Sequence, residues 1–190
     1  MIRRRRNDGD DFTPMDETTV DSRDADGCAC NHSTAPLLSH CCTDAHEVLV
    51  ISLSRFILNG YCGGGIESID AALAVSVDVH GEDTGLALFT SVFAFVRALR
   101  AERQGMYRFF AAQCTKVTPD EQMLLACIQS GRLQEPTTMQ DTLDAVAMGG
   151  SIRFLGPALR RLSGMIDLLA SDSVSSIPSE YSTPTARRLH

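Results

Sequence analysis

The sequence predicts an all-α protein, built as an irregular bundle or orthogonal array of five or six helices between two disordered tails. Apolar residues recur at spacings of three and four through the middle of the chain, glycines and capping residues bound these stretches, and no strand-like alternation competes strongly. The 190 residues include 44% hydrophobic residues, so the chain can form one core.

The composition divides the chain into three parts. Residues 1–43 and 173–190 are rich in polar and charged residues and show no apolar periodicity, so both are expected to be disordered tails. Residues 44–172 are the expected globular domain.

Two helices are expected in the first part of this domain. Asp44 is a good N-cap for the first, which should end at Asn59 and Gly60. The second should run from about Ile66 to Gly81. Its β-branched residues leave a strand over 73–79 as an alternative. Its apolar stripe consists of Ile66, Ile69, Leu73 and Val77.

The third helix, expected over about residues 84–103, has two adjacent apolar rows. A wide apolar face is typical of a helix that is packed on several sides, so this helix should be central. Residues 106–117 lack periodicity and should cross the core surface as an irregular segment.

Three more helices should follow. Thr118 and Glu121 form a capping box around Pro119, which predicts a fourth helix ending at Gly131. Thr137 and Gln140 suggest a second capping box and a fifth helix through Met148. The last helix should begin or kink at Pro157. Its apolar stripe contains Leu155, Leu159, Leu162, Ile166 and Leu169.

The charge and the N-terminus limit the class of protein. A net charge of -7 disfavours a general polyanion binder. Arg3–Arg6 are not followed by the apolar run of a signal peptide, and the longest apolar stretch, 86–96, is shorter than the roughly 20 residues of a membrane span. We therefore expect a cytoplasmic protein with reduced cysteines and no transmembrane segment.

One cluster of residues has an obvious chemical interpretation as a metal site. Zinc is bound by four thiolate or imidazole ligands, but the familiar sites space their paired cysteines differently. A polar tail that happens to contain cysteines is the competing interpretation. Thiol redox chemistry is a third, because a helix N-terminus following Cys41 and Cys42 should lower their pKa values. The candidate ligands are Cys28, Cys30, His32, His40, Cys41, Cys42 and His46.

Two further patterns have both a functional and a structural interpretation. The glycine-rich segment 59–65 could cradle phosphate, but it follows a helix and precedes Glu67, which favours a tight turn. Arginines and aromatics between residues 97 and 110 could bind single-stranded nucleic acid, although anchoring of a loop to the core is the favoured interpretation. The residues concerned are Arg97, Arg100, Arg103, Tyr107, Arg108, Phe109 and Phe110.

The sequence contains no recognisable catalytic set. No nucleophile elbow, metalloprotease motif or cofactor-binding motif is present, so no catalytic or cofactor-binding residue is assigned. His80, beside Gly81, is interpreted as a residue that caps a helix end. The leading hypothesis is a non-catalytic protein-interaction or regulatory module with an unidentified protein partner. The alternatives are a metal- or redox-responsive regulator using the Cys/His cluster, and an enzyme whose site is assembled from distant residues. The oligomeric state is left open.

Overall fold

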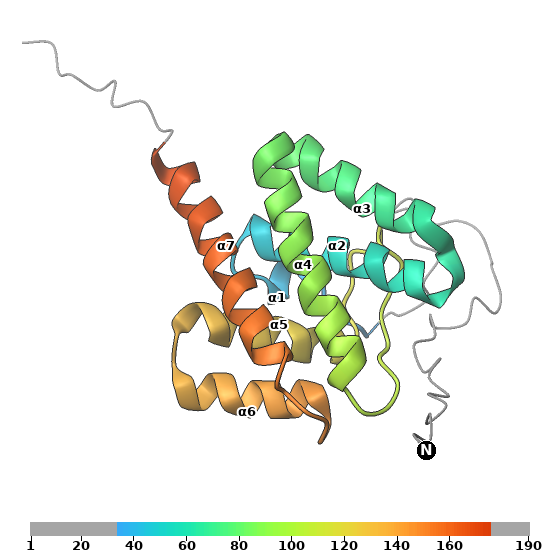
Figure 1. Cartoon of the computed structure of the whole chain (residues 1–190), viewed down its shortest axis with the longest axis vertical. Coiled ribbons are helices and arrows are strands. Elements are labelled where there is room, and N and C mark those ends of the chain that lie inside the picture. The colour runs from blue at the N-terminus through green and yellow to red at the C-terminus, as the bar shows by residue number, and fades with distance from the viewer. Residues whose placement is uncertain (1–33, 176–190) are drawn as a thin grey trace, which may run out of the picture.

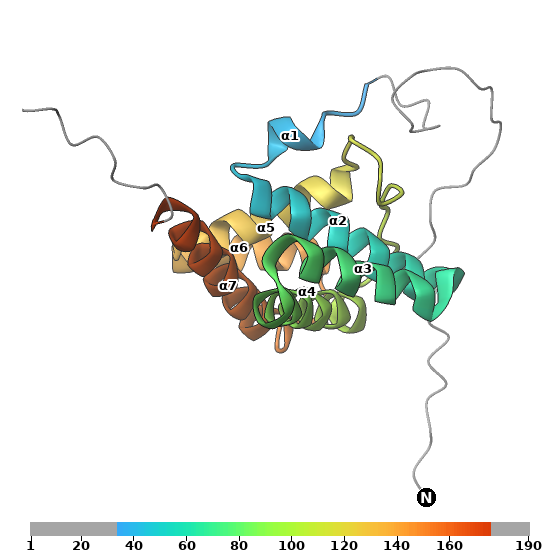
Figure 2. The same ribbon diagram turned by 90° about the horizontal axis from the view of Figure 1, so that it is seen from above.

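The computed structural model describes residues 34–175, and these residues form an all-α array (Figures 1 and 2). Six helices have at least twelve residues, and no strand occurs within 34–175, so the predicted fold class is confirmed. The elements are α1 (Leu38–Cys41), α2 (Ala45–Asn59), the turn η1 (Gly60–Gly64), α3 (Gly65–His80), α4 (Glu82–Glu102), α5 (Pro119–Leu133), α6 (Pro136–Ala147) and α7 (Leu155–Ser175).

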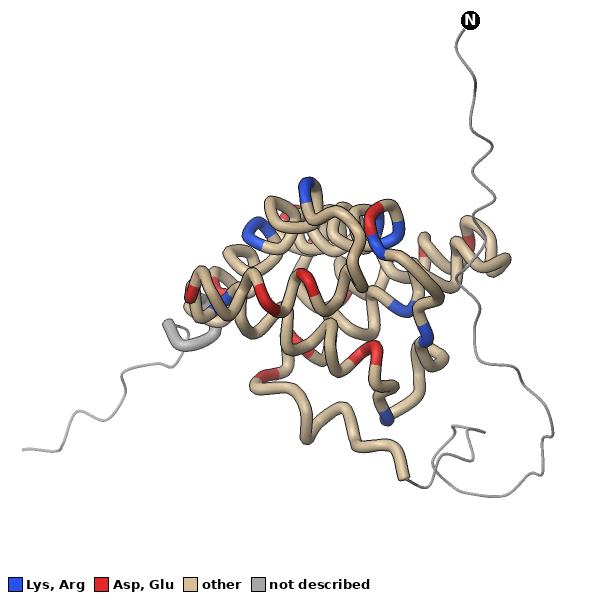
Figure 3. Tube along the Cα trace, turned by 90° about the horizontal axis from the view of Figure 1, so that it is seen from below, with Lys and Arg blue, Asp and Glu red and all other residues tan. Residues whose placement is uncertain are grey.

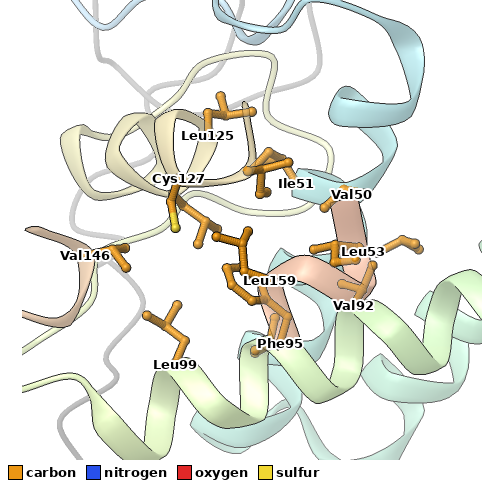
Figure 4. Packing of buried hydrophobic residues seen from close by; sticks show 14 of the residues in the cluster. Val50, Ile51, Leu53, Val92, Phe95, Leu99, Leu125, Cys127, Val146 and Leu159 are labelled. Atoms are coloured by element: carbon orange, nitrogen blue, oxygen red, sulfur yellow. The ribbon is translucent and has the colours of Figure 1, made fainter. Parts of the chain in front are cut away.

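Helix α4 is the central element, as its two apolar rows predict. It packs against α2, α3, α6 and α7. Val92, Phe95 and Leu99 of α4 are fully buried, and they meet side chains from α2, α5, α6 and α7 in one core (Figure 4). Removing these apolar side chains from water is the main force that holds the helices together.

Two of the predicted helix starts are confirmed in atomic detail. The Asp44 carboxylate accepts a hydrogen bond from the Glu47 amide at 3.0 Å, at the start of α2. The Thr118 hydroxyl accepts from the Glu121 amide at 3.1 Å, and the Glu121 carboxylate accepts from the Thr118 amide at 2.8 Å. The capping box of α5 is therefore complete.

Three residues do not have the roles that were predicted for them at the ends of α5 and α6. Gly131 lies buried inside α5, which continues to Leu133 and ends at Gln134 in left-handed backbone. Helix α6 begins at Pro136 rather than at a Thr137 cap, and the Gln140 side chain donates to Asp144 instead of closing a capping box. Gly131 packs against Ser163 and Leu159 of α7, and a Cβ atom there would lie 2.4 Å from the Ser163 Oγ.

The folded part extends beyond the predicted ends of the domain. Leu38 of α1 is buried in the core, its amide donates to the Thr115 carbonyl at 2.7 Å, and α7 runs to Ser175. Residues 1–33 and 176–190, which include most of both predicted tails, lie outside the described residues.

Residues 73–79 are part of helix α3, so the alternative of a strand there is wrong. The buried residues of α3 are the small side chains Ser68, Ala72 and Ser76. Small residues let helix backbones approach closely: the Ser76 hydroxyl donates to the Gly85 carbonyl of α4 at 2.8 Å. The larger apolar residues of α3 are consequently displaced to the edge of its contact with α4.

A buried ion pair joins α2, α5 and the segment between α4 and α5. The Arg55 Nε donates to the Glu121 Oε1 at 2.6 Å, and both side chains are almost completely buried. The other guanidinium N–H groups donate to the Glu121 carboxylate and to the carbonyls of Ala111, Cys114 and Lys116. One side chain therefore fixes both a helix pair and an irregular segment.

Substituting Gly85 tests the close approach of α3 and α4. A Cβ atom at Gly85 would lie 2.5 Å from the Ser76 carbonyl oxygen and 2.6 Å from the Val77 Cα, so the α3 backbone would have to move. We expect Gly85→Ala to lower the free energy of unfolding by about 1–3 kcal/mol, although alanine has the higher helix propensity. Gly164→Ala in α7 is the matched control, because a Cβ there meets nothing within 4 Å. It should raise stability by up to about 1 kcal/mol in urea titrations. Equal effects of the two substitutions would contradict the close approach.

Substituting Arg55 tests the buried ion pair. We expect Arg55→Met to lower the free energy of unfolding by about 3–5 kcal/mol, because the Glu121 carboxylate stays buried without its partner. Arg160→Met, at an exposed position of α7, should change stability by less than about 0.5 kcal/mol. The double substitution of Arg55 and Glu121 by Met should recover part of the loss. Urea titrations in which Arg55→Met unfolds like Arg160→Met would rule out the assigned role.

Candidate functional site

Four of the seven predicted metal ligands lie in the described part of the chain, and they do not converge. His40 is exposed on α1, Cys41 and Cys42 are half-buried, and His46 lies in the first turn of α2. Within residues 34–175, no group of three or more His, Cys, Asp and Glu side chains is placed to hold a metal ion. The other three predicted ligands, Cys28, Cys30 and His32, lie outside the described residues.

The environment of Cys42 corrects the expectation of a reactive thiol. Burial and, next, the negative charge of Glu47 raise the pKa of Cys42 to about 12, although the positive charge of Arg55 opposes this shift. The thiolate is the nucleophilic form of cysteine, and a raised pKa keeps Cys42 largely in the thiol form at neutral pH. The proximity of a helix N-terminus does not outweigh burial and a neighbouring carboxylate.

The polar network beside Cys42 is closed on itself. Arg132 of α5 donates from Nη1 to Asp44 at 2.7 Å and to Glu47 at 2.5 Å, and from Nε to Asp167 of α7 at 2.9 Å. Glu47 also accepts from Gln129 at 2.9 Å. Burial alone would raise the pKa of Asp44, but the Glu47 amide and Arg132 hold it below its usual value. These groups tie α2, α5 and α7 together.

The glycine-rich segment is a turn, as its favoured interpretation predicts. Gly63 and Gly65 have φ angles of 113° and 69°, which glycine adopts readily. The Glu67 carboxylate lies so close to Gly65 that a Cβ atom there would be 2.5 Å from the Glu67 Oε2. A carboxylate over the turn opposes the binding of phosphate.

The segment after α4 is anchored to the core, as expected. Tyr107, Phe109 and Phe110 are all buried, so they offer no stacking platform for bases. Arg103 is also buried and pairs with Asp120 at 2.8 Å. Acidic and basic positions are interspersed over the described chain, so no broad basic surface is present there (Figure 3).

The outer side of α3 and α4 carries the clearest candidate surface. Ile66 is 63% exposed and Leu86 is 50% exposed, while the neighbouring apolar residues along both helices are half-buried. Helical spacing places the large α3 residues next to the row of Ser68, Ala72 and Ser76, at the edge of the contact with α4. The α3–α4 face is defined here as Tyr61, Ile66, Ile69, Leu73, Val77, Leu86, Phe89 and Phe93.

Aromatic contacts connect the two sides of this face. The Phe93 ring lies 5.8 Å from the Phe89 ring and 6.2 Å from the Tyr61 ring, measured between centroids. The Arg100 guanidinium lies 4.6 Å above the Tyr61 ring, within range of a cation–π interaction. The turn before α3 and the second half of α4 are therefore one continuous surface.

The charges beside the α3–α4 face differ in sign between the two helices. Glu67, Asp70 and Asp78 are exposed on α3, and Arg97 is exposed on α4, one turn beyond Phe93. Sequence reasoning predicted the apolar stripe of α3 but not the surface that this stripe forms with α4. The row of small residues at 68, 72 and 76 is the signal that could have revealed it.

Two helical stretches, Ala45–His80 and Glu82–Glu102, reach the length and apolar character of a membrane span. Core helices of compact domains meet the same criteria, and both stretches contribute buried side chains to this core. The result is therefore weak evidence for a span, and the absence of a transmembrane segment stays a prediction.

A pair of histidines joins the start of α2 to the end of α3. The rings of His46 and His80 are stacked, with centroids 5.5 Å apart and planes inclined by 12°. The His46 Nδ1 and the His80 Nε2 are buried and have no hydrogen-bond partner within residues 34–175. Asp44 lies 3.8 Å from the His46 Nδ1. His80 therefore packs between helices, in addition to ending α3.

Comparison with protein-family models, with curated proteins and with solved structures gave no match to this chain.

The histidine pair predicts a loss of stability in mild acid. Burial lowers the pKa of His80 below its usual 6.5, and the neighbouring His46 lowers it further. The unfolded chain therefore takes up a proton at His80 before the folded chain does, so stability should fall as the pH drops below about 6.5.

Urea titrations between pH 7 and pH 5 measure this effect. We expect His80→Gln to lose less stability than the original chain over this range, because glutamine does not titrate. Asp44 and Glu102, whose pKa values are lowered, act only at more acidic pH. Parallel pH profiles for the two chains would show that His80 does not contribute.

Proposed function

We propose that this chain is a non-catalytic protein-interaction module of the cytoplasm, and that it binds a protein partner through the α3–α4 face. The observation that carries the proposal is the position of the large apolar residues of this helix pair. Small residues fill the inner contact of α3, while Ile66 and Leu86 are exposed beside half-buried aromatic rings.

Such a surface is typical of a binding site. A contiguous, exposed apolar patch is unfavourable in water unless another molecule covers it, and patches rimmed by polar residues mark interaction sites. Aromatic residues and arginine are also enriched at the centres of protein interfaces. The α3–α4 face has both features, with Phe89, Phe93 and Tyr61 inside it and Arg97 and Arg100 beside it.

The polar residues described above support binding rather than catalysis. Arg55, Arg103 and Arg132 are each held by carboxylates of neighbouring elements. Glu102 accepts hydrogen bonds from the Phe154 and Leu155 amides, at 2.9 Å and 2.7 Å respectively. Burial alone would raise the pKa of Glu102, but these amides hold it below its usual value. These groups stabilise helix ends and helix contacts.

Site-specific photo-cross-linking tests the proposal. A photoreactive amino acid at Leu86, inside the α3–α4 face, should form protein adducts in cells. The same amino acid at Leu168 of α7, which is also exposed, should not. A partner identified from the adducts is then purified and titrated against the original chain and against Leu86→Asp, which should weaken binding about tenfold or more.

Two outcomes would contradict the proposal. One is the absence of adducts from position 86, and the other is equal labelling at positions 86 and 168. Unchanged affinity of the purified partner for Leu86→Asp would place the contact elsewhere.

A further inference from the structure

We infer that the partner on the α3–α4 face is a second copy of this chain, which forms a two-fold symmetric dimer. This inference rests on the proposed function and adds the identity of the partner. It is argued from the arrangement of charges on the two helices, because that arrangement is complementary to itself.

The chain reversal at Gly81 places opposite charges at the same end of the helix pair. Glu67 precedes Gly81 by about as many residues as Arg97 follows it, so the two lie at similar distances from the reversal. Tyr61, in the turn that leads into α3, contacts Phe93 and Arg100, so this turn lies against the second half of α4. Figure 1 shows α3 and α4 running away from this shared turn.

Consider a two-fold axis that runs along the α3–α4 face, midway between the two helices. Rotation about this axis would lay α3 of one copy over α4 of the other. A rotation does not change the position of a residue along its axis. Glu67 and Asp70 of each copy would therefore face Arg97 of its partner. The apolar residues between them would be buried in the middle of the contact. In an isologous interface each favourable pair occurs twice, and the four helices together resemble a four-helix bundle.

The exposed charges are available for this pairing. Glu67, Asp70 and Arg97 are exposed, and none of them forms a salt bridge within residues 34–175. A lipid surface is a less suitable occupant, because an anionic membrane would be repelled by the acidic row of α3. A different protein would need a matching pair of charged rows, whereas a second copy supplies them by symmetry.

Sedimentation equilibrium of the full-length chain, combined with charge reversal, tests the dimer. The original chain should sediment as a dimer that dissociates on dilution. Arg97→Glu should raise the dimer dissociation constant by about tenfold or more, because it places like charges opposite each other at two sites. Glu67→Arg combined with Asp70→Arg should have a similar effect for the same reason.

Mixing the two charge-reversed chains provides the decisive measurement. In a mixed dimer, the glutamate at position 97 of the Arg97→Glu chain faces the two arginines introduced into the other chain. The original acids Glu67 and Asp70 of the Arg97→Glu chain face the unchanged Arg97 of the other chain. The mixture should therefore associate about as tightly as the original chain. The matched controls are Arg160→Glu and the double change Asp141→Arg with Asp144→Arg, two exposed acids of α6 with the same spacing. The controls should leave the dissociation constant unchanged, and circular dichroism checks that each variant is folded.

The outcomes separate this inference from the proposed function. The inference that the partner is a second copy would be overturned if the original chain is monomeric or if the mixture does not associate. In that case adducts of another protein at position 86, or binding to vesicles, would identify a different occupant. If position 86 forms no adducts with either this chain or any other protein, the proposed function fails as well.

Discussion

The contact between Arg55 and Glu121 is the constraint on which the rest of the structure depends. The segment between α4 and α5 contains no helix, so its backbone carbonyls need partners from elsewhere. Arg55 supplies them from α2, while Glu121 both neutralises Arg55 and caps α5 through the Thr118 amide. The ion pair, the cap of α5 and the anchored carbonyls of the segment are thus one hydrogen-bonded network. Each of these polar groups would be costly to bury without the others. This network holds α5 against α2, with α4 packed along the same core.

Local chemistry explains which parts of the fold the sequence predicts. The Asp44 cap and the Thr118–Glu121 box act within one helical turn, so their outcome depends on adjacent residues alone. Gly131 was expected to end a helix, but it lies inside α5 and packs against residues of α7. The start of α7 is capped by Glu102 of α4, about fifty residues earlier in the chain, which no local pattern indicates. Interactions between distant segments therefore decide the helix limits that sequence reasoning missed.

The same distinction applies to the candidate sites. The Cys/His cluster is dense in sequence, but burial, followed by the negative charge of Glu47, raises the pKa of Cys42. The reactivity expected from a helix N-terminus was reversed by that environment. The α3–α4 face, in contrast, is built from residues with ordinary sequence neighbours, and it exists because α4 lies next to α3. Crowding of chemically active residues was a weaker guide here than the distribution of large and small residues along one helix.

The row of small residues on α3 explains why close packing and an exposed apolar face occur together. With Ser68, Ala72 and Ser76 on its inner side, α3 can approach α4 closely enough for Ser76 to donate to the Gly85 carbonyl. The larger residues of α3 then have no room between the backbones, so they occupy the edge of the contact. If the large residues had faced inward, the helices would stand further apart and the face would be mostly polar. The close helix contact and the binding surface therefore have one origin, the alternation of small and large side chains around α3.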